Sequence, residues 1–351
     1  MSAAPAVLAR VRAAAAALRV RWSAGPVILM YHRVAEPDSD PWQLAVSPRH
    51  FGEHLEVIRR RLRPLPLRGL VGALAEGGAP RRGAVVTFDD GYADNLHAAR
   101  PLLERHDVPA TVFVVAGMVG SREGFWWDRL AGLLLHRGRL PASVELELEG
   151  ERLSLPLEGG SPAVEEAPER WVASDPPRTP REAAFLLLGR RLRRIGSAER
   201  EAILEELAGS QGISPIADPA ARALSADELP RLAAGGLVEV GAHTVTHTEL
   251  AALSPAAQER EIRGSRAELE ACIDEPVVSF SYPFGGRSQY TPETARLVRE
   301  AGFASACTTS AAPLRRSADP FRLPRVHVPD CDGDAFARLL SRWTPLADAA
   351  R

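Results

Sequence analysis

Two short segments of the chain carry residue types that bind metals and move protons. Asp89 and Asp90 are adjacent carboxylates at the end of an apolar run, and His243 and His247 are imidazoles four residues apart after another such run. One carboxylate and two imidazoles suit zinc and other first-row divalent ions. A spacing of four lets both imidazoles reach one ion from a single turn. An ion with three protein ligands keeps open positions for catalysis.

The second aspartate requires a separate chemical role. Adjacent residues at a strand end point to opposite sides, so one aspartate can bind the metal while the other accepts a proton from water. A non-haem iron oxygenase also uses two histidines and one carboxylate, but that chemistry leaves the doubled aspartate unexplained. The pattern therefore favours a metal-assisted hydrolase.

The elements that position these residues alternate between strands and helices. Short apolar runs predict strands over 27–31, 84–88, 111–115, 237–240, 277–282, 304–308 and 325–328. Helical spacing and capping signals predict helices over 48–62, 94–105, 180–192, 254–272 and 291–302. This alternation is typical of α/β folds, in which functional groups collect where strands end.

The alternation of predicted strands and helices is interrupted in one stretch, which divides the chain. Residues 126–223 contain a predicted hairpin over 144–155 and read as an inserted α+β subdomain. The main domain would then comprise 25–125 and 224–345, after an Ala/Arg-rich leader over 1–24.

Composition excludes several classes of protein. A formal net charge of −2 over 351 residues argues against a nucleic-acid partner. No stretch approaches the roughly 20 apolar residues of a transmembrane segment, and the apolar run in the leader is too short for a signal peptide, so a cytoplasmic location is expected. Peripheral membrane contact through a basic amphipathic leader is the alternative. Three cysteines without a C-x-x-C pair indicate buried free thiols. The oligomeric state is left open.

The two motifs together resemble a known family. Thr87-Phe88-Asp89-Asp90-Gly91 with a downstream His243-Thr244-Val245-Thr246-His247 resembles the polysaccharide deacetylases, the NodB-homology or carbohydrate esterase type. Such proteins fold as an irregular (β/α) barrel and remove N-acetyl, sometimes O-acetyl, groups from sugars. The resemblance implies Asp89 as general base and Asp90, His243 and His247 as metal ligands. It also makes Ser281-Tyr282-Pro283-Phe284-Gly285 a groove wall.

Two departures from the family pattern concern the base and the acid. In many members the groove motif begins with an arginine that holds the base in place, and here that position is Ser281. The run Ile28 to His32 resembles a histidine-bearing strand moved to the front, as in the circularly permuted branch that acts on poly-N-acetylglucosamine. We therefore expect His32 to be the general acid, with His327 in reserve.

The sequence thus predicts a metal-dependent hydrolase that removes N-acetyl groups from the amino sugars of a glycan or glycan precursor. The expected cofactor is Zn²⁺, with Co²⁺, Ni²⁺, Mn²⁺ or Fe²⁺ as alternatives. Expected substrate contacts are Tyr92, Tyr282, Pro283 and Phe284, and the Tyr92 backbone N–H is the expected oxyanion donor. The alternatives are hydrolysis of another amide, in a formylated sugar or a cyclic ureide, and a non-catalytic glycan-binding module.

Overall fold

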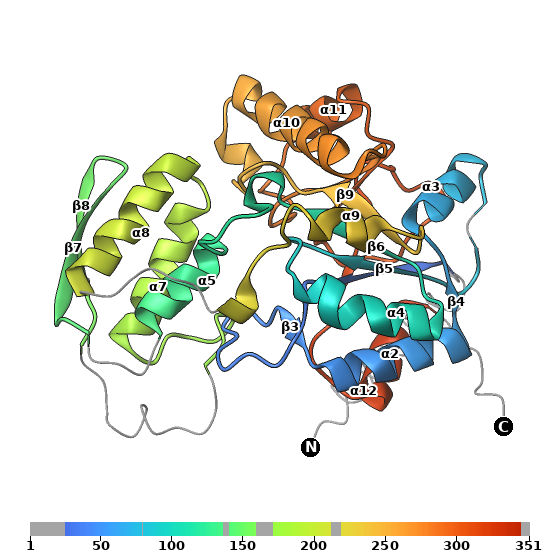
Figure 1. Ribbon diagram of the computed structural model, residues 1–351, viewed down its shortest axis with the longest axis horizontal. Helices are drawn as coiled ribbons and strands as arrows, with labels where there is room; N and C mark the ends of the chain where they lie inside the picture. Colours follow the sequence, from blue (N-terminus) through green and yellow to red (C-terminus); the bar gives the residue numbers. More distant parts are fainter. Residues whose placement is uncertain (1–24, 79, 136–139, 159–170, 212–218, 345–351) are drawn as a thin grey trace, which may run out of the picture.

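The computed structural model describes residues 25–78, 80–135, 140–158, 171–211 and 219–344. Its centre is a curled parallel sheet with helices on both sides (Figure 1). The strands run in the order β11–β10–β9–β6–β5–β1–β12, and β4 pairs with β5 at the side. Their bounds are β1 Val27–Tyr31, β4 Arg63–Pro64, β5 Gly83–Phe88, β6 Ala110–Val114, β9 Val238–Ala242, β10 Ser279–Ser281, β11 Ser305–Cys307 and β12 Val326–His327.

The helices that cover this sheet include those predicted over 48–62, 254–272 and 291–302. They are α2 Pro48–Arg61, α3 Leu67–Ala75, η1 Asn95–Ala99, α4 Arg100–His106, η2 Ala116–Met118, α9 Glu228–Ala233, η4 Leu250–Ala252, α10 Pro255–Ile273, α11 Pro292–Glu300 and α12 Gly333–Leu340. The Ser47 and Ser254 side chains cap α2 and α10. The predicted helix over 94–105 is instead a π-helical turn followed by α4. Strands β2 Arg33–Val34 and β3 Ala45–Val46 form a separate parallel pair.

The described elements between 126 and 223 form their own layer of helices beside a hairpin, to the left in Figure 1. These elements are α5 Trp126–Leu134, β7 Ser143–Leu148, β8 Glu151–Pro156, α7 Pro180–Leu192, α8 Ser197–Gln211 and η3 Pro219–Ala221. The predicted capping box at the start of α7 is confirmed, with Thr179 and Glu182 bonding each other's backbone N–H groups. Apolar side chains of these elements form a cluster separate from that of the sheet. We call residues 126–223 the insert; the division of the chain into leader, barrel and insert stays a prediction.

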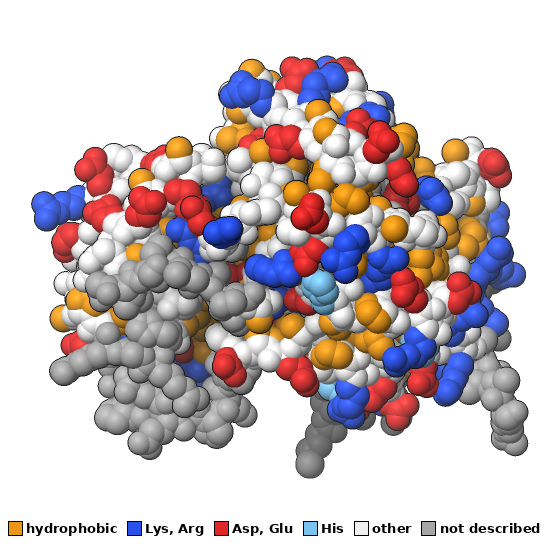
Figure 2. Space-filling model, in the orientation of Figure 1, with side chains coloured by type: hydrophobic (Ala, Val, Ile, Leu, Met, Phe, Trp, Pro, Cys, Tyr) orange, Lys and Arg blue, Asp and Glu red, His pale blue; other side chains and the backbone are white. Residues whose placement is uncertain are grey.

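Most of the predicted strands and helices are confirmed, and the fold is the expected irregular (β/α) barrel, open as a half-barrel. The leader lies outside the described residues. Of the three thiols, Cys307 is buried, but Cys272 and Cys331 are half-buried, which corrects the expectation for those two. No helix in the described part of the chain has the length and apolarity to span a membrane. On the face in Figure 2, acidic and basic side chains are interspersed.

Candidate active site

Strand register brings the predicted catalytic residues to one edge of the sheet. Tyr31 at the end of β1 pairs with Phe88 at the end of β5, so His32 and Asp89 leave neighbouring strands at the same level. The Asp89 backbone N–H donates to the Tyr31 carbonyl at 3.0 Å. His243 leaves β9, and its backbone N–H donates to the Val114 carbonyl at the end of β6. Parallel strands therefore place all these side chains around one point.

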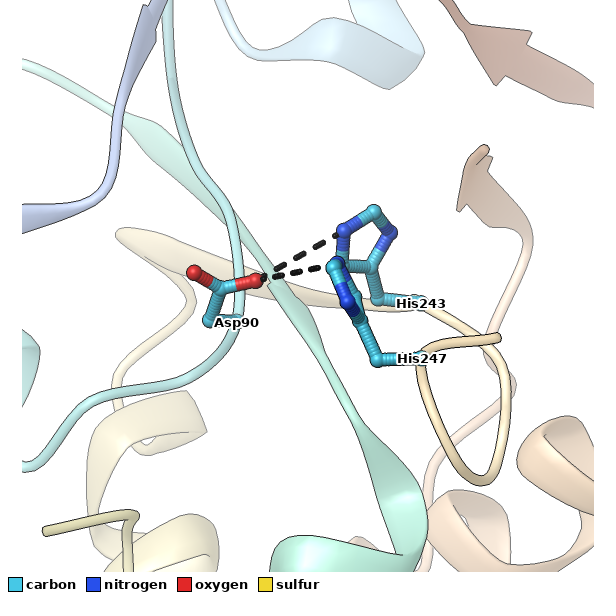
Figure 3. A group of neighbouring side chains, drawn as sticks. All are labelled: Asp90, His243 and His247. Carbon is cyan, nitrogen blue, oxygen red and sulfur yellow. Dashed lines mark ion pairs between the residues drawn. The ribbon is translucent and has the colours of Figure 1, made fainter. Parts of the chain in front are cut away.

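The three predicted metal ligands form a compact, buried group (Figure 3). Their ligand atoms all lie within 4.8 Å of one another. Asp90 Oδ1 is 3.7 Å from His243 Nε2 and 3.5 Å from His247 Nε2. The carboxylate comes from the end of β5 and the imidazoles from the loop after β9, so all three converge from two sides of a gap. This nitrogen–nitrogen–oxygen set fits a first-row divalent cation.

Protonation and hydrogen bonding also suit a cation at this point. The Nδ1–H of His243 donates to the Ser281 carbonyl at 2.7 Å, which leaves the Nε2 lone pair facing Asp90. Burial lowers the pKa of both imidazoles and keeps them neutral, as ligands must be. Burial and the neighbouring Asp89 raise the pKa of Asp90. A cation beside Asp90 would oppose that shift and favour the ionised carboxylate.

Asp89 is held by an arginine that the sequence analysis did not assign. Arg325, immediately before β12, is completely buried and donates from Nη1 and Nη2 to the two Asp89 carboxylate oxygens at 2.7 and 2.6 Å. Its Nη2 also donates to Ser281 Oγ at 2.8 Å, and its Nε donates to the Thr308 carbonyl. Burial alone would raise the pKa of Asp89, but the charge and hydrogen bonds of Arg325, together with His243 and His32, outweigh burial and lower the pKa to about 2. Asp89 is thus ionised and oriented, as the predicted base would have to be.

This arginine resolves the departure at Ser281. The position that carries a base-holding arginine in many family members is here a serine, whose hydroxyl accepts a hydrogen bond from Arg325. The guanidinium that holds Asp89 therefore comes from the segment before β12, and Ser281 helps to orient it. The sequence signal was the segment Arg325-Val326-His327, in which the arginine precedes a residue already considered as an acid.

The loop that carries the imidazoles is held from two sides. Glu261 on α10 accepts hydrogen bonds from the Val245 and Thr246 backbone N–H groups, each at 2.9 Å. From the other side, Arg200 on insert helix α8 donates to the Thr246 carbonyl at 3.1 Å and to Thr248 Oγ1 at 2.7 Å. Arg200 is 2% exposed, so these bonds are shielded from water. The insert therefore contributes directly to the shape of the metal-ligand loop.

The backbone is strained where the ligands sit. Asp90, Thr244, His247 and Phe284 all have φ between 55° and 76°, a left-handed conformation that side chains other than glycine rarely adopt. Gly91, next to Asp90, has φ 83°, and a Cβ there would lie 3.0 Å from Val114 Cγ1. Such conformations persist only where the surroundings fix them, and they cluster at functional sites.

A cavity of about 340 Å³ opens above these groups. The barrel contributes His32, Asp89, Asp90, His243, His247, Phe284 and Thr309, and the insert region contributes Ala173, Leu186, Gly189, Arg190 and Arg193. Aromatic side chains that the sequence analysis did not place in a site, Trp42, Trp126 and Trp127, line it as well. The cavity therefore lies between the barrel and the insert, with the predicted base and ligands as its floor.

The two candidate acids differ in their position. His32 lines the cavity beside Asp89, and burial lowers its pKa to about 3 although Asp89 opposes this shift. His327 is not among the lining residues, and its Nε2 lies 3.2 Å from the Gln43 carbonyl. The two rings are 6.2 Å apart. Proximity to the base therefore favours His32.

Three of the four expected substrate contacts are buried away from the cavity, which corrects those predictions. The Tyr92 hydroxyl donates to Asp128 at 2.8 Å and accepts from Trp127 Nε1 at 2.7 Å. The Tyr282 hydroxyl donates to the Phe321 carbonyl, and Pro283 is also buried. Both tyrosine side chains are fully shielded, because Tyr282 packs in the apolar cluster of the sheet and Tyr92 in that of the insert. Phe284 does line the cavity, with its ring centroid 4.8 Å from that of His247.

Fold and site together define an α/β half-barrel with three side chains that could hold a metal ion and a buried, arginine-bound carboxylate beside them. The family model of the polysaccharide deacetylases matches residues 76–138 and 184–306, more than half of the chain. The chain belongs to the polysaccharide deacetylase family, whose members are enzymes that hydrolyse N-acetyl groups on glycans.

Individual relatives are more distant. YxkH of Bacillus subtilis (strain 168), a protein named for this family, is 28% identical over 127 residues, which are 35% of this chain and 44% of YxkH. The chain thus matches less than half the length of this relative. The Streptococcus pyogenes deacetylase PplD, solved in complex with acetate, superposes with a TM-score of 0.56 at 17% identity, covering 92% of this chain and 99% of that one. IcaB from Ammonifex degensii gives 0.53 at 20% identity, covering 91% and 96%.

The matched stretches include only part of the site. Asp89, Asp90, His243 and His247 lie within them, whereas His32 and Arg325 lie outside. The cavity floor is thus completed by two strands, β1 and β12, that the family model does not reach.

Proposed function

We propose that this protein is a metal-dependent deacetylase that hydrolyses the N-acetyl groups of amino sugars in a glycan or glycan precursor. The observation that carries the proposal is the pairing of Asp89 with Arg325 beside the Asp90, His243 and His247 cluster. An ionised, buried base next to a cation site is the arrangement that amide hydrolysis by water requires. Membership of the deacetylase family supports the choice of an acetyl group.

Asp90, His243 and His247 would hold the ion, with Zn²⁺ as the first choice because two imidazoles and a carboxylate suit it. Cobalt, nickel, manganese and iron(II) share this ligand preference and are the alternatives. A bound divalent ion supplies Lewis acidity, which polarises the acetyl carbonyl and lowers the pKa of water.

Proton transfer and stabilisation of the oxyanion would be carried out by residues of the chain. Asp89 accepts a proton from the attacking water, and the bidentate Arg325 keeps the carboxylate ionised and pointing into the cavity. His32 donates a proton to the departing amine nitrogen, which would otherwise be a poor leaving group. Because burial lowers the pKa of His32 to about 3, its imidazole is neutral before the reaction, and the proton that it passes to the amine nitrogen is the one that Asp89 has taken from water. The Tyr92 backbone N–H is the proposed donor to the oxyanion.

Acetate release from N-acetylglucosamine oligomers by protein reconstituted with Zn²⁺ tests the proposal, run beside Asp89→Asn. We expect release by the unmutated protein and a loss of about 10²- to 10⁴-fold in the variant, with one equivalent of metal retained by both. Equal rates in the two proteins would remove Asp89 from the mechanism. Metal binding without release from any acetylated sugar would contradict deacetylation and leave hydrolysis of a different amide.

A further inference from the structure

One face of insert helix α7 is turned toward the cavity. Leu186, Gly189, Arg190 and Arg193 follow one another at helical spacing, and all four line the cavity. Other α7 side chains, Phe185, Leu188 and Leu192, are buried in the apolar cluster of the insert. The helix therefore has two faces in use, one for folding and one that carries two cationic side chains toward the predicted reaction centre.

The helix is held close to the cavity by a glycine. A Cβ on Gly189 would lie 3.2 Å from Cζ2 and 3.3 Å from Cη2 of the Trp42 indole. Trp42 also packs on Phe185, with ring centroids 4.9 Å apart. The indole thus lies against the helix backbone and leaves little room for movement of this wall.

Arg193 is oriented with donors to spare. Its Nε lies 2.9 Å from Glu249 Oε2, and its guanidinium carbon lies 5.5 Å from the centre of the Phe284 ring. Within the described part of the chain, neither Nη nitrogen of Arg193 has a hydrogen-bond partner. Because Phe284 in turn contacts the His247 ring, this pair of donors stands one aromatic ring away from a predicted metal ligand.

Arg190 adds a second charge one turn earlier on the same face. It is exposed, and none of the described residues forms an ion pair with it. Among the described residues that line the cavity, Asp89 and Asp90 are the only carboxylates. Asp89 is neutralised by Arg325, and Asp90 belongs to the cation site. Glu249, outside the lining, offsets the charge of Arg193, and no described carboxylate pairs with Arg190, so the α7 wall carries net positive charge, which favours an anionic ligand.

We propose that Arg193 and Arg190 form a subsite for an anionic group, a phosphate or a carboxylate, carried by the acetylated amino sugar. Arginine's planar fork binds either oxyanion in a bidentate manner, and a guanidinium already oriented by Glu249 and Phe284 loses less entropy on binding. The inference rests on the proposed deacetylase function and specifies its substrate class: an acetamido sugar with negative charge on the same or the adjacent unit.

The test compares substrates that differ in this group. Acetate release is measured for the neutral dimer of N-acetylglucosamine, for N-acetylglucosamine 6-phosphate and 1-phosphate, and for N-acetylmuramic acid, which carries a carboxylate. We expect kcat/KM for at least one anionic sugar to exceed that for the neutral dimer by about tenfold or more. Whether a phosphate or the carboxylate gives the larger ratio distinguishes the two sources of the anion.

Variants then assign the preference to α7. In Arg190→Gln and in the double variant with Arg193→Gln, the anionic-to-neutral ratio of kcat/KM should fall by about 10- to 100-fold. Arg190 is exposed, so its replacement leaves folding intact even if loss of the Arg193 contact to Glu249 does not. Arg194→Gln is the matched control, because that exposed side chain is adjacent but is not part of the lining, and the ratio should not change.

Two results would overturn the subsite: no preference for any anionic sugar, or a preference that survives in the double variant. The second would mean that the anion binds the metal and not the arginines. Tryptophan fluorescence titration of the same proteins separates the subsite from the deacetylase function, because Trp42, Trp126 and Trp127 line the cavity. Tighter, arginine-dependent binding of an anionic sugar without acetate release would support the subsite and refute deacetylation.

Discussion

The barrel wall and the insert wall of the cavity are held in different ways. On the barrel wall, Asp89 and His243 are each 2% exposed, and each is fixed by hydrogen bonds shorter than 3 Å to a buried partner. On the insert wall, Arg190 is exposed and the side chain of Arg193 is 31% exposed, with a single carboxylate partner. Side chains that transfer protons or bind a metal need a fixed geometry, whereas side chains that select a substrate can be exposed to solvent and less constrained.

The same difference sets the size of mutational effects. A charge on the barrel wall has its partner in a dry environment, so removing either member leaves a buried, uncompensated charge. A charge on the insert wall is screened by water, and its loss changes binding more than stability. We therefore expect large effects on metal content, turnover and folding from the barrel wall and modest effects on KM from the insert wall.

The largest effect is expected from the ligands. Asp90→Ala and His243→Ala should each lose stoichiometric Zn²⁺ and lower acetate release by about a thousandfold or more, because the ion's electrostatic contribution of several kcal/mol disappears. Metal content after dialysis and the rate of release measure this. His106→Ala, on α4 and outside the lining, is the control and should keep both. A ligand variant that retains one equivalent of metal would place the ion elsewhere.

Arg325→Met should destabilise the barrel wall without removing a ligand. Loss of the cation leaves Asp89 buried without its partner, which should lower the free energy of unfolding by about 3–5 kcal/mol in urea titrations. The pair Arg263–Glu259 is a matched control, since both side chains are half-exposed and Arg263→Met should cost under about 1 kcal/mol. Similar losses in the two variants would contradict a special role for the buried pair.

The pH dependence of the same variant follows from the Asp89 pKa. In the folded protein this pKa is lowered to about 2, below the unfolded value of about 3.9, so Asp89 adds stability above pH 3.9 that is lost as the pH falls through 2. Without Arg325, burial dominates and raises the pKa of Asp89. The acid limb of the pH–rate profile should then move to higher pH than in the unmutated protein. An unmoved limb would mean that Asp89 does not limit the rate in acid.

Arg200→Met tests an exception to this comparison, because Arg200 belongs to the insert but is buried and hydrogen-bonded like the residues of the barrel wall. Arg200 holds the loop of His243 and His247 through the Thr246 carbonyl and Thr248, so its removal should weaken Zn²⁺ binding by about 10- to 100-fold. Turnover at saturating metal should fall less. Calorimetric titration of metal into the folded variant measures the affinity, and thermal unfolding monitors its folding separately. A lower unfolding temperature with unchanged metal affinity would limit Arg200 to a structural role.

The sequence predicts most site residues of the barrel wall because they lie in short local motifs. Asp89-Asp90 and His243-x-x-x-His247 follow apolar runs, and parallel pairing brings strand ends together whatever the intervening chain does. Arg325 escapes such reasoning because its partner is 236 positions away and depends on which strands become neighbours. Tyr92 and Tyr282 were misplaced for a related reason: motif position does not say whether a side chain turns toward the cavity or into the core.

Local motifs do not predict which residues of the insert line the cavity. The capping box at Thr179 predicts α7 correctly and gives its first residue. Which face of α7 packs in the insert core and which meets the cavity depends on how the insert seats on the barrel. That seating is set by contacts such as Trp42 against Gly189, which join residues far apart in the chain.

The smallest predicted effect tests the insert wall by itself. Leu186 lines the cavity from α7 and is half-buried, so Leu186→Ala should raise KM for an acetylated sugar by about 3- to 10-fold while kcat and metal content stay unchanged. Its neighbour Leu187 is 41% exposed and is not part of the lining, so Leu187→Ala should change neither constant. A fall in kcat at constant KM in Leu186→Ala would show that the insert wall stabilises the transition state. The two walls would then differ in how they are held but not in what they do.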